Sequence, residues 1–189
     1  CSTYYSYYRR SNFRKKSNLI KIINEAGERL IGKPMGRYIT LETHKLYKSS
    51  QAFSSVCDVL CREIRKLLPS QGTVLVVGLG NEDITPDALG PKSIDRLFAT
   101  RHIGSEFAQS LGLGELRSVA GFVPGVLGKT GIETVEIIGG VVKKIEPTCV
   151  IVIDALAARS TARLGTTVQL ADTGVSPGSG VGNRRKAIN

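Results

Sequence analysis

The fold of this chain is decided by residues 78–91, which read Gly-Leu-Gly-Asn-Glu-Asp-Ile-Thr-Pro-Asp-Ala-Leu-Gly-Pro. The stretch follows an apolar run at 74–77 (Val-Leu-Val-Val) that is typical of a buried parallel strand. It brings the carboxylate of Asp87 to the place where such a strand ends. Ligands of open α/β sheets bind in the crevice outside the carboxyl ends of the strands. We therefore expect Asp87 to lie in a functional site.

A second carboxylate arrives in the same way. Asp154 directly follows another apolar run, Val-Ile-Val-Ile at 150–153. Two carboxylates within a few Å of each other cannot both ionise cheaply, so the pair would offer an acid and a base together. Such a pair can activate water against a peptide carbonyl and protonate the leaving amine. An alternative for Asp87 is a purely structural role as the N-cap of the helix after Pro86, because aspartate is a preferred cap.

The glycines of this loop raise the possibility of a phosphate cradle, which the spacing rejects. Gly78 and Gly80 begin a dinucleotide-binding pattern, but Asp83 stands where its third glycine is needed. Gly128-Lys129-Thr130 comes nearest to a phosphate loop, but the preceding glycine, Gly125, is too close. We expect no nucleotide cofactor.

The rest of the chain alternates helical and strand patterns. This alternation predicts an α/β fold with a three-layer, open, mainly parallel sheet and helices on both faces. We expect strands at 18–23, 74–77, 119–123, 150–153 and 166–170, helices at 50–68, 87–100 and 132–145 with a short one through Ala162, turns at 27–38, and loops at 104–131 and 172–183.

The formal net charge of +10 is concentrated at the ends. The first 21 residues contain six Lys or Arg and no acid, and residues 184–186 read Arg-Arg-Lys. We expect residues 1–16 to form a disordered basic tail and residues 17–189 to form one domain. Tyrosines close to the arginines of the tail leave open a role in binding nucleic acid by stacking on bases.

Composition narrows the class of protein further. A length of 189 residues with 41% hydrophobic residues is typical of one globular domain, and no run is long enough to span a membrane. No signal peptide opens the chain, so we expect a cytoplasmic protein, and four sparse cysteines fit reduced thiols. These cysteines and two histidines are too scattered to predict a metal site. Ser179 lies between Gly178 and Gly180 without a nucleophile elbow, so we expect a flexible or substrate-contacting loop.

Several long motifs, in the right order, resemble the spore germination protease family from about Gly32 to the last residue. They are Gly36 through Glu42, Gly78-Leu79-Gly80-Asn81 through Pro91, Thr100-Arg101-His102, Pro124-Gly125-Val126 with Thr130 through Thr134, Ile153 through Arg159, and Asp172-Thr173-Gly174 through Gly182-Asn183.

The resemblance implies an endopeptidase of the spore core that begins the degradation of small acid-soluble spore proteins during germination. The family's atypical pair of aspartates falls on Asp87 and Asp154. Gly78, Gly80 and Asn81 would shape the loop, and Gly178, Ser179, Gly180 and Asn183 would approach the substrate. Members are homotetramers made as inactive precursors, and no cofactor is implied.

The sequence departs from the family pattern in two places, and two alternative functions stay open. Residues 1–16 do not resemble the family's N-terminus, and the family continues beyond Asn189, so we expect a domain that is incomplete at its C-terminus. Hydrogenase maturation peptidases share the fold and recognise a metal with two acids and a histidine, which leaves a metal-dependent peptidase as one alternative. Both histidines of this chain precede Asp154, so metal dependence is not expected. The other alternative is a non-catalytic fragment with a nucleic-acid-binding tail.

Overall fold

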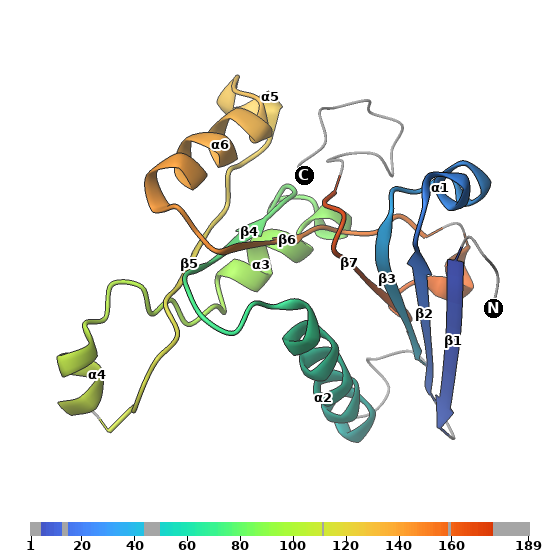
Figure 1. Cartoon of the computed structure of the whole chain (residues 1–189). Coiled ribbons are helices and arrows are strands. Elements are labelled where there is room, and N and C mark those ends of the chain that lie inside the picture. Colours follow the sequence, from blue (N-terminus) through green and yellow to red (C-terminus); the bar gives the residue numbers. More distant parts are fainter. Residues whose placement is uncertain (1–4, 13–14, 44–49, 111, 159, 176–189) are drawn as a thin grey trace. The chain divides into compact units, whose positions relative to one another are not determined.

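A computed structural model describes residues 5–12, 15–43, 50–110, 112–158 and 160–175 of the chain (Figure 1). These residues divide into two compact units. The first contains the described residues up to Leu68 and those from Ala158 to Gly174, and the second contains Pro69–Ala157 and Val175. The single domain expected over 17–189 is therefore built as two units, each with its own sheet.

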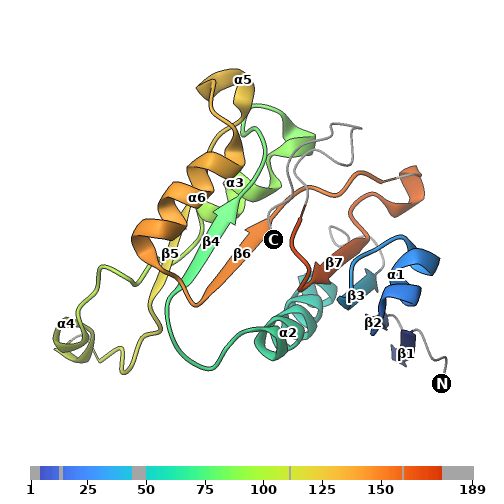
Figure 2. The same ribbon diagram turned by 45° about the horizontal axis from the view of Figure 1, so that its top comes forward.

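The second unit is built on a parallel sheet of three strands, which lie side by side in Figure 2. β4 (Val74–Gly78) is central, between β5 (Val119–Phe122) and β6 (Cys149–Ile153). Both neighbours pair with β4 in parallel, so all three carboxyl ends meet at one edge. The strands expected at 74–77, 119–123 and 150–153 are confirmed, and so is a parallel sheet in an open α/β arrangement.

Helices pack on both faces of this sheet, and the side chains of β4 point alternately toward one face and the other. Leu75 and Val77 are almost fully buried in a core with Ile138 of α6 (Thr134–Ile145). The opposite face carries α3 (Leu89–Ile94), which contacts β4 and β6. Burying each Val or Leu side chain stabilises the fold by roughly 1.5–3 kcal/mol, so this core fixes the edge that carries Asp87 and Asp154.

The helix expected at 87–100 is shorter in the structure. A turn of 3-10 helix, η2 (Thr85–Asp87), is followed by α3, which ends at Ile94. Beyond the helix, the backbone N–H groups of Thr100 and Arg101 both donate to the carbonyl oxygen of Val119, at the start of β5. Two further short helices are α4 (Ser105–Ser110) and α5 (Leu127–Thr130), which lie in a region expected to be loop.

The first unit holds an antiparallel sheet in the order β1-β2-β3-β7. Its strands are β1 (Tyr5–Asn12), β2 (Lys15–Ile22), β3 (Gly36–Thr43) and β7 (Thr167–Ala171). The strands expected at 18–23 and 166–170 are confirmed, but the expectation of a mainly parallel sheet holds only for the second unit, because every pair here is antiparallel. A period-2 pattern marks a strand without fixing its direction.

Residues 1–16 were expected to form a disordered tail, but part of this segment is a strand, β1, in the structure. Tyr5–Asn12 pairs with β2 residue by residue, from Tyr5 opposite Ile22 to Asn12 opposite Lys15. Such a ladder satisfies backbone N–H and C=O groups without an apolar pattern in the sequence, which is why composition predicted disorder. Residues 1–4 and 13–14 lie outside the described part of the chain.

The turns expected at 27–38 are replaced by a helix and the start of β3. The helix, α1 (Glu25–Ile31), is capped by Asn24, whose side chain accepts the N–H of Gly27 at 2.9 Å, and by Gly32 in the left-handed conformation. Seven residues are too few for a helical period to be visible in the sequence. The helix expected at 50–68 is confirmed as α2 (Ser50–Leu67), which contacts β3.

A short 3-10 turn, η3 (Thr161–Arg163), precedes β7 where a short helix was expected. The core of the first unit contains Ile22, Ile39 and Leu41, all nearly inaccessible to solvent. Among the residues that the structure describes, no helix is both long enough and apolar enough to cross a membrane.

Candidate active site

Asp87 lies at the end of a tight loop that leaves the carboxyl end of β4. The Asp87 carboxylate turns back along this loop, and its Oδ2 accepts the backbone N–H of Asn81 at 2.8 Å. The N-cap residue of α3 is Ala88, and that helix end has no side-chain cap. The alternative role of Asp87 as an N-cap is therefore wrong, and its carboxylate belongs to the loop at the edge of the sheet.

Gly80 makes this loop geometry possible. Its φ of +114° lies in a region that side chains with a Cβ rarely adopt. A Cβ at Gly80 would also overlap the backbone carbonyl oxygen of Asp87. Gly80 and Asn81 both approach Asp87 in this loop, and the shaping role expected for Gly78, Gly80 and Asn81 stays a prediction.

Contacts between the Asp87 loop and β6 join the two strand exits at this edge of the sheet. The backbone N–H of Leu79 donates to the carbonyl oxygen of Ile153 at 2.8 Å, which ties the exit of β4 to the exit of β6. Gly90, in α3, packs directly on this junction, and a Cβ there would overlap the backbone of Leu79 and lie 2.7 Å from the Ile153 oxygen. The start of α3 therefore sits against the residues that lead to both acids.

Asp154 follows β6 directly, and its side chain is about half-buried. Burial raises the pKa of the Asp154 carboxyl, and the negative charge of Asp87 raises it further. The N–H of Ala155, which donates to Asp154 Oδ1 at 2.8 Å, opposes both effects only in part. Asp154 therefore favours its protonated form more than an ordinary aspartate does.

The two acids expected to meet at the carboxyl edge of the sheet are both placed there, close enough to interact electrostatically. The Asp87 carboxylate accepts the backbone N–H of Asn81, and Asp154 is held where a neutral carboxyl is favoured. One group of the pair can therefore accept a proton while the other supplies one.

One ion pair of this site was missed by the sequence analysis. Lys129 of α5 pairs with Asp83 in the loop before η2. In the sequence Lys129 stands only in an incomplete phosphate-loop pattern, and an ion pair between residues 46 positions apart leaves no local signal. Gly178, Ser179, Gly180 and Asn183 lie outside the described residues. Within the described ranges, no group of three or more His, Cys, Asp or Glu side chains could hold a metal ion.

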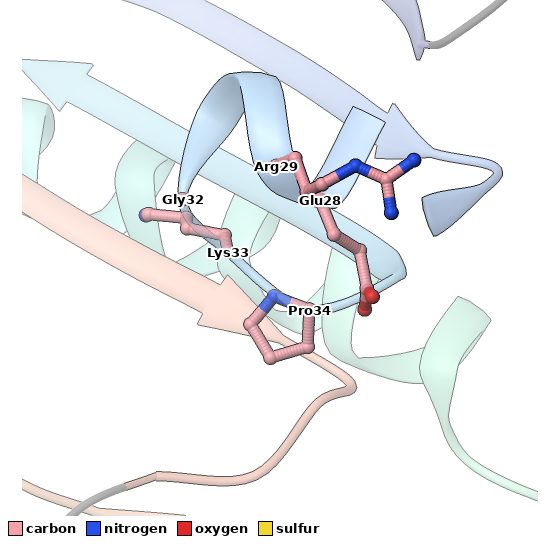
Figure 3. Close-up of a pocket in the computed structure, with 5 residues that line it drawn as sticks. All are labelled: Glu28, Arg29, Gly32, Lys33 and Pro34. Atoms are coloured by element: carbon pink, nitrogen blue, oxygen red, sulfur yellow. The ribbon is translucent and has the colours of Figure 1, made fainter. Parts of the chain in front are cut away.

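The first unit has a shallow, open depression along α1 and the segment that leads into β3 (Figure 3). Its lining residues are Glu28, Arg29, Gly32, Lys33 and Pro34. The Glu28 carboxylate accepts the N–H of Met35 at 2.6 Å, and Lys33 lies 4.9 Å from the centre of the Tyr38 ring. The Glu28–Met35 contact links α1 to the segment that leads into β3. None of the expected site residues lines the depression.

Comparison with known proteins places the chain in a family. A profile described as germination protease matches residues 10–189. Proteins named germination protease from Caldanaerobacter subterraneus subsp. tengcongensis, Priestia megaterium and Clostridium tetani are 50%, 47% and 45% identical to it, over 92%, 88% and 93% of this chain. The aligned regions cover 54%, 46% and 55% of those relatives, so the chain spans about half of their length. The resemblance predicted from the sequence motifs is confirmed, and the chain belongs to the germination protease family, a family of peptidases.

Proposed function

We propose that this chain carries the catalytic acids of an endopeptidase in which Asp87 and Asp154 activate water against a peptide bond. The observation that supports the proposal most strongly is that two carboxylates lie at one edge of a parallel sheet and that the pKa of one of them, Asp154, is raised by burial and by the charge of the other, Asp87. Membership in a peptidase family supports the choice of a peptide bond as the target.

In this proposal Asp87 is the base and Asp154 is the acid. As the water oxygen bonds to the carbonyl carbon, Asp87 takes one of the water protons, and as the carbon–nitrogen bond breaks, Asp154 gives its proton to the leaving amine. The assignment rests on burial, which favours a neutral Asp154, so that Asp87 is the carboxylate of the pair left to accept the proton. A proton then returns from Asp87 to Asp154 through solvent before the next turnover.

The substrate that we propose is a small acid-soluble spore protein, degraded during spore germination in the spore core. This choice rests on the family resemblance. It includes the expectation that the intact protein is a homotetramer and that Gly178, Ser179, Gly180 and Asn183 contact the substrate. Gly78, Gly80 and Asn81 would hold the Asp87 loop in shape, as the close approach of Gly80 to Asp87 supports.

The proposal is tested by Asp87→Asn and Asp154→Asn in the intact protein that carries this sequence. Each substitution keeps the size of the side chain and removes its proton chemistry. General acid–base catalysis contributes about 10²–10⁴-fold, so we expect the rate of cleavage of a purified small acid-soluble spore protein to fall by that order. Asp95→Asn, at the exposed end of α3, is the matched control and should cleave normally. Wild-type cleavage by both Asp87→Asn and Asp154→Asn would refute the proposal.

A further inference from the structure

The three loops that leave the carboxyl ends of the parallel sheet each contribute a charged residue. β4 leads to Asp87 and β6 leads to Asp154. β5, which ends at Phe122, leads through a short segment to α5 and Lys129. Because the strands are parallel, this third loop begins at the same edge as the two acids.

Lys129 is carried by a well-fixed turn. Its backbone N–H and that of Thr130 both donate to the carbonyl oxygen of Val126, and the N–H of Gly131 donates to the oxygen of Leu127. The Thr130 hydroxyl adds a hydrogen bond to the carbonyl oxygen of Ile132 at 3.1 Å. The lysine therefore projects from a backbone that local hydrogen bonds hold in place.

The lysine side chain is directed to the Asp87 loop. Its ammonium group forms an ion pair and hydrogen bond with Asp83 Oδ2. The Asp83 hydrogen bond and charge, with the charge of Glu82, raise the pKa of Lys129, so the amine stays charged. Both side chains are largely exposed, and exposed ion pairs contribute little to global stability. The pair is therefore better placed to fix a loop than to stabilise the fold.

Asp83 connects this ion pair to Asp87 through hydrogen bonds. The Asp83 N–H donates to the side-chain oxygen of Asn81 at 3.1 Å, and the N–H of Ile84 donates to the Asn81 carbonyl oxygen at 3.2 Å. The Asn81 N–H in turn donates to Asp87 Oδ2 at 2.8 Å. The position of Asn81, which orients the Asp87 carboxylate, therefore depends on the segment that Lys129 holds.

We propose that Lys129 is a positioning residue for the acid pair: by holding Asp83, it keeps the loop at 81–84 in the geometry that presents the Asn81 N–H to Asp87. This inference rests on the proposed function. Lys129 acts through Asp83 and Asn81, and it takes no part in proton transfer itself.

Lys129→Ala in the intact protein tests the inference against Lys144→Ala, an exposed lysine on α6 in the same unit. Misplacing a catalytic group by about 1 Å can cost up to 10²-fold, so we expect kcat for cleavage of a small acid-soluble spore protein to fall by about tenfold, with little change in KM. The split between kcat and KM, together with rescue by Lys129→Arg, distinguishes this positioning role from a purely structural one.

Two rescue variants complete the test. Lys129→Arg keeps the positive charge, and the exchanged pair Asp83→Lys with Lys129→Asp restores the attraction in the opposite sense, so both should recover most of the lost kcat. The inference is overturned if Lys129→Ala matches Lys144→Ala, if KM rises with kcat unchanged, or if neither rescue variant recovers activity. Active Asp87→Asn and Asp154→Asn variants would instead refute the proposed function, whatever Lys129 does.

Discussion

At the residue scale, Asp154 is held in a position where ionising its carboxyl costs stability. A half-buried carboxyl beside another carboxylate is more costly to ionise than the same group in water. The sequence allowed this pair to be predicted because each acid directly follows, or closely follows, an apolar strand. The raised pKa of Asp154 could not be predicted, because the burial of this carboxyl depends on the folded structure.

We predict that Asp154→Asn makes the protein more stable at neutral pH. The pKa of Asp154 is raised in the folded state, so folding loses stability as the pH rises from the usual aspartate range through the raised value. Below that window Asp154 is protonated in both the folded and the unfolded wild-type protein, so the variant and wild type should be equally stable. Above it the variant should gain up to about 1 kcal/mol, a small value because water still screens the side chain.

Urea denaturation at a series of pH values measures this difference. The free energies of unfolding of variant and wild type should diverge only as the pH rises. A variant that is less stable than wild type at neutral pH, or a difference that does not depend on pH, would contradict the account of Asp154.

At the scale of elements, an arginine–aspartate pair that has no signal in the sequence links β3 to the end of β7 in the antiparallel sheet. Arg37 at the start of β3 donates to Asp172, just after β7, through its backbone N–H to Oδ1 and through Nε to Oδ2, each at 2.7 Å. Both residues belong to motifs that carried the family resemblance. Their partnership could not be predicted, because 135 positions separate them and the antiparallel pairing of β3 with β7 was not foreseen.

We predict that Asp172→Asn weakens the pairing of β3 with β7. Although partial burial raises the pKa of Asp172, the hydrogen bonds and charge of Arg37 lower it below its ordinary value overall. The stabilisation is therefore present above the usual aspartate pKa and is lost as the pH falls through the lowered value. At neutral pH the variant should lose about 1 kcal/mol of unfolding free energy.

Thermal denaturation at neutral and acidic pH checks this prediction, with Glu42→Gln as the control. Glu42 pairs with Arg163 at 3.5 Å, and both side chains are exposed, so its loss should have little effect. Equal melting temperatures for Asp172→Asn and wild type at neutral pH would show that the Arg37 contact does not stabilise the sheet.

Element prediction succeeded where the apolar pattern was strong. β4 and β6 could be predicted from short uninterrupted apolar runs, and α2 and α6 from apolar residues at helical spacing. α1 and β1 were missed because the helix is short and capped by Asn24 and Gly32, and because the strand is polar and held by backbone pairing.

At the scale of the whole molecule, each unit has its own apolar core. Leu75, Val77 and Ile138 are central to the second unit, and Ile22, Ile39 and Leu41 are central to the first. The division into two units could not be predicted, because the first is assembled from segments on both sides of the second in the sequence.

We predict that core substitutions act mainly within their own unit. Leu75→Ala and Ile39→Ala each remove a nearly fully buried side chain and should cost about 2–5 kcal/mol. Amide hydrogen exchange should accelerate in β4 and β6 for Leu75→Ala, and in β2 and β3 for Ile39→Ala. Equal acceleration of both sheets by either variant would show that the two cores unfold as one.

Titration of the Asp154 carboxyl carbon by NMR shows whether Asp87 and Asp154 form one electrostatically coupled acid pair. We expect Asp154 in the wild-type protein to titrate above the ordinary range of aspartate. We also expect Asp87→Asn to move this titration to lower pH, because a negative neighbour is removed. An Asp154 that titrates in the ordinary range and does not respond to Asp87→Asn would show that the two acids are not coupled.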